Sequence, residues 1–292
     1  MKKAILIYGI IILILVFLLS GCKKTEIKEE KYKIVTSFYP IYIITANITD
    51  GAKNIELVNM TDQNVGCIHD YTLSTREMKN LEQANLFIQN GLELENFMEK
   101  IKEIYSNVKI LNSSEGITGY IEDEDEINPH IWTSLDNYII QIQKISEGLI
   151  KEDPDNKEIY EKNTKSYIEE IKRLKEEYKS KLKKLDGKKA ICLNEALEYI
   201  AKDVKLDIIS IHTDHDESIL SAENLKSIIN EMKQENINII LIGKEDNSKN
   251  AELISKETGA KIYKVNTGLS GDMNKNSYVN AVKENIEVLA SI

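Results

Sequence analysis

Two hydrophobic patterns alternate along the first half of the chain after residue 31. Short β-branched runs lie at residues 33–38, 55–60, 86–91 and 108–113, and amphipathic stretches lie at residues 76–84 and 94–106. Continuous apolar runs of this length are typical of buried parallel strands, and three- and four-residue spacing is typical of helices. The pattern therefore predicts an α/β lobe over residues 32–152.

Residues 153–186 carry a different pattern, in which apolar side chains recur at three- and four-residue steps without a break. Pro154 suits the first turn of a helix, and the sequence DGKK after Leu185 is typical of a helix end. We predict one long helix here, about 45 to 50 Å in length at about 1.5 Å per residue.

Beyond residue 186 the alternation of strands and helices starts again. Strands are predicted at residues 189–194, 207–212, 237–243 and 261–266, and helices at residues 196–203, 222–234, 249–257 and from Tyr278 onwards. We therefore expect an α/β protein with a second lobe at 187–292, joined to the first by the long helix. Ligand sites in parallel sheets lie at the carboxyl ends of the strands, so the loops there are the candidates for function.

The N-terminus has the pattern of a secretory signal. Two lysines and an apolar run from Ala4 to Leu19 precede the small residues that end at Cys22, so residues 1–21 are predicted to be a signal peptide. The sequence LSGC resembles a bacterial lipobox, which implies that Cys22 carries the lipid anchor. An uncleaved transmembrane anchor is the alternative. Residues 22–31 are polar and predict a flexible tether, so we expect the protein on the extracytoplasmic face of the cell membrane.

Charge and motifs exclude several classes of function. A formal net charge of −10 argues against binding to nucleic acid and is compatible with a cationic ligand. The chain has no G-x-S-x-G, no phosphate-binding loop, no dinucleotide fingerprint and no H-E-x-x-H, so we do not expect an enzyme.

Two histidines stand where strand ends of the first lobe are expected to converge. His69 follows the strand at 55–60, and His130 lies in the sequence NPHIW. Neutral imidazole is the commonest protein ligand of zinc and related ions, so both are candidate metal ligands.

Three stretches of the chain, IVTSFYPIYIITANITDG, HDYTLSTREMKNLEQANLFIQNGLELENFMEK and NPHIWTSLDNY, together resemble the metal-binding solute receptors of ABC importers, the zinc and manganese ZnuA/adhesin-type family. The resemblance implies two Rossmann-like parallel-sheet lobes joined by a long rigid helix, with a metal ion in the cleft between them. It implies that His69 and His130 are ligands and that Trp132 packs beside the second. It also implies Zn²⁺ or Mn²⁺ as the transported ligand and a membrane permease as partner. We expect a monomer.

The second lobe departs from the family pattern. Asn194 and Asn266 stand where the family has a histidine or carboxylate ligand, and an amide oxygen is a weak partner for zinc. We therefore expect Glu195 and His215 to complete the site.

Other donors of the second lobe and the two cysteines of the mature chain stay open as alternatives. His212 and Asp272 are further candidates, and Cys67 and Cys192 are ligands, a disulfide or passive thiols.

The sequence thus predicts a lipid-anchored receptor that captures a divalent transition metal, Zn²⁺ in the first place and Mn²⁺ in the second, for an ABC permease. Two other functions are carried as alternatives. One is a surface adhesin or structural lipoprotein that has lost the metal, and the other is an exported metalloenzyme whose metal activates water.

Overall fold

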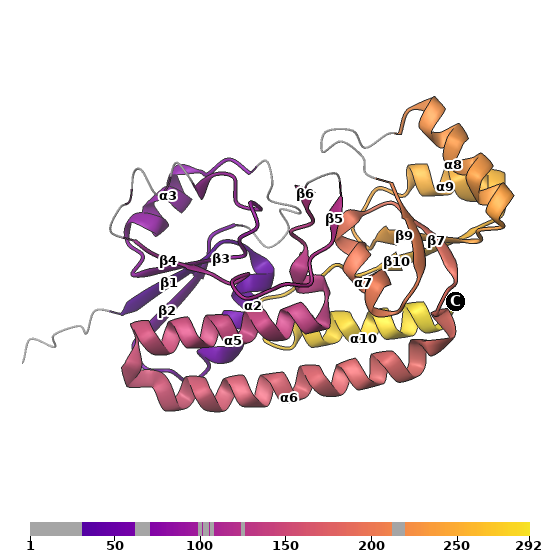
Figure 1. The fold of residues 1–292 in the computed structure, drawn as a ribbon. Helices are drawn as coiled ribbons and strands as arrows, with labels where there is room; N and C mark the ends of the chain where they lie inside the picture. The colour runs from indigo at the N-terminus through magenta and orange to yellow at the C-terminus, as the bar shows by residue number, and fades with distance from the viewer. Residues whose placement is uncertain are drawn as a thin grey trace, which may run out of the picture. The chain divides into compact units, whose positions relative to one another are not determined.

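The computed structural model describes residues 31–61, 71–98, 101, 105, 108–123, 126–211 and 220–292 (Figure 1). Within this range Tyr32–Ile292 belongs to one compact unit. Several predicted features lie outside the described residues: the signal peptide, the tether apart from Lys31, and Cys22, Cys67, His69, His212 and His215.

The first sheet consists of four parallel strands at the N-terminal end of this unit. They are β1 (Tyr32–Thr36), β2 (Ile55–Asn59), β3 (Leu86–Gln89) and β4 (Lys109–Asn112), in the order β2-β1-β3-β4. The central strands β1 and β3 are almost entirely buried, as expected for a parallel sheet whose two faces are covered.

The second sheet repeats this strand order with a different sequence. Its parallel strands are β7 (Lys189–Cys192), β8 (Asp207–Ser210), β9 (Ile239–Gly243) and β10 (Lys261–Val265), in the order β10-β9-β7-β8. In both sheets the first strand of the half lies between the second and the third. The point at which the strand order reverses, called the switch point below, therefore lies between β1 and β3 and between β7 and β9.

Eight described helices accompany the sheets: α2 (Tyr39–Ile48), α3 (Thr75–Glu82), α5 (Leu135–Glu152), α6 (Lys157–Leu182), α7 (Glu198–Asp203), α8 (Ala222–Glu235), α9 (Lys249–Thr258) and α10 (Ser277–Ala290). A short antiparallel pair, β5 (Glu122–Asp123) and β6 (Glu126–Ile127), precedes the sequence NPHIW. None of the described helices has the length and apolar character needed to cross a membrane.

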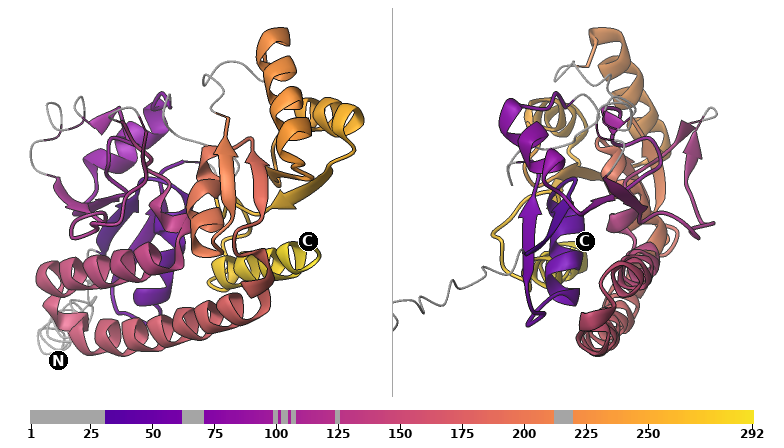
Figure 2. Two further views of the ribbon diagram at one scale, coloured as in Figure 1. Left: turned by 45° about the vertical axis from the view of Figure 1, so that its right-hand side comes forward. Right: turned by 90° about the vertical axis from the view of Figure 1, so that its left-hand side faces the viewer.

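The long helix is shorter than predicted. Pro154 opens a separate 3₁₀ turn, Pro154–Asn156, and Lys183–Leu185 forms another at the far end, so the α-helix has 26 residues. At 1.5 Å per residue this is about 39 Å. α6 packs against α5 and α2 from the first half and α10 from the second (Figures 1 and 2), so it supports both sheets.

The elements predicted from the pattern omit α2 and α5. α2 has no contrasting polar face, because Ile41, Ile43, Ile44 and Ile48 are all buried, and a helix that is apolar on most sides lacks the usual period. The predicted helix at 94–106 falls partly outside the described residues. The predicted limits of the lobes, 32–152, 153–186 and 187–292, stay a prediction, since Tyr32–Ile292 is one unit.

Candidate metal-binding site

His130 is held in one position by its neighbours in the chain. It precedes the 3₁₀ turn Ile131–Thr133 and is 2% exposed. The Oδ1 atom of Asn128 lies 3.0 Å from the backbone nitrogen of His130 and 2.9 Å from its ring Nδ1. The Thr133 hydroxyl donates to the carbonyl oxygen of His130 at 2.8 Å. Both the backbone and the ring of His130 are therefore oriented without any ligand.

Trp132 packs beside the imidazole. Its ring centroid lies 5.1 Å from that of His130 and 5.0 Å from that of Phe38. The indole N–H donates to the carbonyl oxygen of Thr267 at 2.9 Å, and that residue belongs to the loop after β10. Trp132 thus fixes His130 on one side and joins the two halves of the unit.

Glu195 comes to His130 from the second half. It is the first residue of the 3₁₀ turn Glu195–Leu197 that leads into α7. Its Oε1 lies 3.8 Å from the His130 Nδ1, and its side chain is 30% exposed. An imidazole and a carboxylate from different halves of the chain therefore lie close together.

Asn194 has a structural role. Its side-chain oxygen accepts a hydrogen bond from the backbone N–H of Ala196 at 2.8 Å, which caps the turn. Its amide nitrogen donates to Asp246 Oδ2 at 2.8 Å. The side-chain oxygen of Asn194, at the position where the family pattern has a ligand, therefore accepts a hydrogen bond within the turn.

The thiol of Cys192 is buried and reduced. Its Sγ donates to the carbonyl oxygen of Asn194 at 3.2 Å. Burial raises the pKa of this thiol to about 12, and the thiolate is the form that binds metals. The described structure therefore shows Cys192 as a core residue.

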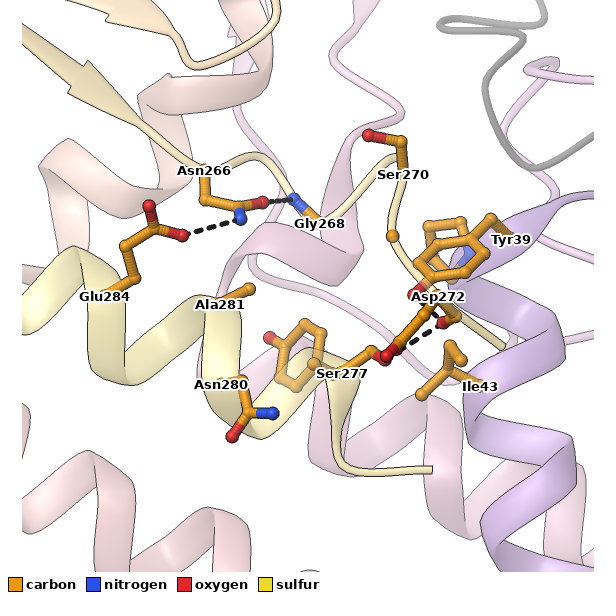
Figure 3. Close-up of a pocket in the computed structure, with 13 residues that line it drawn as sticks. Tyr39, Ile43, Asn266, Gly268, Ser270, Asp272, Ser277, Asn280, Ala281 and Glu284 are labelled. Carbon is orange, nitrogen blue, oxygen red and sulfur yellow. Dashed lines mark hydrogen bonds between the residues drawn. The ribbon is translucent and has the colours of Figure 1, made fainter. Parts of the chain in front are cut away.

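Asn266 and Asp272 line a pocket of about 240 Å³ between α2, the loop after β10 and the start of α10 (Figure 3). The amide of Asn266 accepts from the N–H of Gly268 and donates to Glu284. The carboxylate of Asp272 accepts from the hydroxyl of Ser277. Neither His130 nor Glu195 lines this pocket.

A buried polar cluster at the end of β3 supports the loop that carries His130. Asn90 donates from its side chain to the carbonyl oxygen of Pro129 at 3.0 Å, and Gln141 donates to the side-chain oxygen of Asn90 at 3.0 Å. The carboxylate of Glu95 accepts the N–H groups of Asn90 and Gly91. Burial raises the pKa of Glu95 to about 6. Sequence reasoning missed these residues because amides and a glutamate have no distinctive spacing.

The halves also meet at Asp203, the last residue of α7. Its carboxylate accepts the backbone N–H of Leu135 at 3.1 Å and the hydroxyl of Ser134, and thus caps α5 from the other half. Burial raises the pKa of Asp203 to about 6. This contact sets α7, and the turn before it, against the start of α5.

Of the four predicted ligands, the structure brings together His130 and Glu195. No group of three or more histidines, cysteines and carboxylates that could hold a metal occurs within the described ranges. His69 and His215 lie outside those ranges. The ligand set of His69, His130, Glu195 and His215 therefore stays a prediction, with two members located.

Comparisons with known proteins show which proteins this chain is similar to. Residues 34–292 match the family model ZnuA, "Zinc-uptake complex component A periplasmic". The chain is 28% identical over 285 residues to the high-affinity zinc uptake system protein ZnuA of Bacillus subtilis (strain 168), covering 90% of this chain and 88% of the relative. It is 26% identical to the manganese ABC transporter substrate-binding lipoprotein PsaA of Streptococcus anginosus, covering 99% and 98%.

A solved structure of similar fold is the laminin-binding protein Lmb of Streptococcus agalactiae, described as bifunctional with adhesin and metal transporting activity. The TM-score is 0.78 at 27% identity, covering 89% of this chain and 98% of that one.

Proposed function

The chain belongs to the ZnuA family of periplasmic zinc-uptake components, and from that premise we propose that it is the solute receptor of an ABC importer for a divalent transition metal. The observation that carries the proposal is the proximity of His130 and Glu195, which come from two halves with the same sheet topology: Oε1 of Glu195 lies 3.8 Å from Nδ1 of His130. A buried imidazole and a partly exposed carboxylate are ligands of first-row divalent ions.

We propose Zn²⁺ as the first choice of metal and Mn²⁺ as the second. With His69 and His215, the donors would be three imidazoles and one carboxylate. Four nitrogen and oxygen donors of this kind suit tetrahedral zinc, and a larger share of oxygen ligands would suit manganese. Relatives named for zinc and for manganese are both similar to this chain.

Calorimetric titration of metal-free protein with Zn²⁺ and Mn²⁺ tests the proposal. We expect binding tighter than micromolar, with one ion per chain and Zn²⁺ preferred. Element analysis of protein from its native host, with an X-ray absorption edge spectrum, would identify the metal and its nitrogen and oxygen neighbours. If neither ion binds more tightly than micromolar, the receptor function is wrong and an adhesin or structural lipoprotein replaces it.

The proposed location is the outer face of the cell membrane, with Cys22 as the lipid-bearing residue and the ABC permease as partner. Labelling cells with a radioactive fatty acid tests the anchor. We expect label in the wild-type protein and none after Cys22→Ser, with the variant released from the membrane fraction. A labelled variant would show that the lipid is attached elsewhere.

A further inference from the structure

The side chain of Asn128 can lie in only one of its two amide orientations. One end of the amide faces the backbone N–H of His130 at 3.0 Å, and the other faces the carbonyl oxygen of Glu195 at 2.9 Å. An N–H must meet an oxygen, and a carbonyl must meet a donor. The backbone therefore fixes Oδ1 toward His130 and Nδ2 toward Glu195.

This orientation also fixes the proton on the imidazole. The same Oδ1 lies 2.9 Å from the Nδ1 of His130, and an amide oxygen can only accept a hydrogen bond. Nδ1 must therefore carry hydrogen. The carboxylate oxygen Oε1 of Glu195, 3.8 Å from the same nitrogen, is likewise an acceptor. In the neutral ring the lone pair is then on Nε2, which is the usual consequence of such a partner at a metal-binding histidine.

The amide nitrogen of Asn128 is bound to residues of the second half of the protein. Nδ2 donates to Oε2 of Glu198 at 2.8 Å as well as to the carbonyl oxygen of Glu195. Asn128 is 8% exposed and Glu198 is 4% exposed. A single buried amide thus contacts the ring of His130 and the turn that carries Glu195.

We propose that Asn128 is a positioning residue of the metal site, which holds His130 in the tautomer that presents Nε2 and couples that orientation to the contact between the two halves. This inference rests on the proposed function. Because one amide contacts both halves, the ring of His130 keeps its orientation only while the turn at residues 195–198 is in place.

Tyr199 provides a matched control. Its hydroxyl donates to the backbone carbonyl oxygen of Asn128 at 2.8 Å, so it joins the same residue to α7, the helix that follows the turn. Tyr199→Phe removes this bond and the bond that the hydroxyl accepts from the N–H of Ile121 at 3.1 Å, and it leaves the amide of Asn128 in contact with His130. The two variants therefore separate orientation of the ring from general support of the loop.

The first measurement uses purified metal-free wild-type protein labelled with ¹⁵N in its histidines. A two-bond ¹H–¹⁵N correlation spectrum, with the His130 signals assigned from their loss in His130→Ala, should show Nδ1 protonated and Nε2 bare. A ring protonated on Nε2 would overturn the proposal. This result does not depend on metal binding, so it is distinct from a failure of the proposed function.

The second measurement is the Zn²⁺ affinity of two variants. We expect Asn128→Ala to lower the affinity by about 10- to 100-fold, the usual cost of losing such a partner, and to shift His130 toward protonation at Nε2. Tyr199→Phe should leave the tautomer unchanged and the affinity within about threefold, well under the lower end of that range. Equal losses in the two variants would show that Asn128 acts only by supporting the loop.

Discussion

The two parallel sheets share one strand order, but their switch points have different contents. At the end of β3 the carboxylate of Glu95, 4% exposed, accepts two backbone N–H groups. At the end of β9 the carboxylate of Asp246, which is half-buried, accepts the N–H of Gly243 and the amide of Asn194. In both halves a carboxylate of the chain therefore lies at the switch point, which is where a doubly wound sheet usually binds its ligand.

The proposed metal therefore belongs to the contact between the halves. The first half contributes a buried, fixed imidazole, and the second contributes a carboxylate that is 30% exposed. The buried imidazole of His130 is therefore oriented before a metal binds, whereas the exposed carboxylate of Glu195 can change its position.

Removing the imidazole should have the largest effect. We expect His130→Ala to weaken Zn²⁺ binding by more than about 100-fold, because loss of an outer partner alone costs up to that much. Calorimetry measures the affinity, and circular dichroism of the metal-free variant checks that it folds. An unchanged affinity in a folded variant would remove His130 from the site and, with it, the fixed side of the comparison.

Glu95 should make the stability of the protein depend on pH. Its pKa is about 6 in the folded protein against 4.5 for the free group, so the folded state holds the proton more tightly. The contribution of Glu95 to stability is then fully present below about pH 4.5 and is lost as the pH rises through about 6, a change of about 2 kcal/mol. Urea denaturation of wild type and Glu95→Gln across this range measures it.

The free energy of unfolding of Glu95→Gln should fall less than that of the wild type over the same pH range, whatever its absolute value. Glu93→Gln, an exposed position in the same turn, is the control and should keep the wild-type slope. A wild-type slope in Glu95→Gln would mean that another group is responsible.

The carboxylate side of the site should be weaker than the imidazole side. We expect Glu195→Gln to lower Zn²⁺ affinity by about tenfold, or about 1.4 kcal/mol, since an amide oxygen retains the shape and loses the charge. The control is Glu252→Gln on α9, whose carboxylate accepts from Ser248 at the surface. A loss as large as that of His130→Ala would contradict the division between a fixed and an adjustable side.

The sequence predicted the α/β class, the repeated alternation and the family, and these are confirmed. It proposed His130 as a ligand from the resemblance, and Glu195 as a replacement because Asn194 stands at the position where the family has a stronger ligand. It could not predict Asn128, because the role of an amide depends on which backbone groups face it in space. It also placed the ends of the long helix too far out, since Pro154 and Lys183 each lie in a 3₁₀ turn.

The smallest effect should come from Asn194. Its oxygen caps the turn before α7, so we expect Asn194→Ala to lower the free energy of unfolding by about 1 kcal/mol, the usual value for a lost cap. Its Zn²⁺ affinity should change less than that of Glu195→Gln. Asn266→Ala is the matched variant, because its oxygen likewise accepts the N–H two residues later. If Asn194→Ala lowers affinity more than Glu195→Gln does, the amide is a ligand, and the second half would present two donors from one turn.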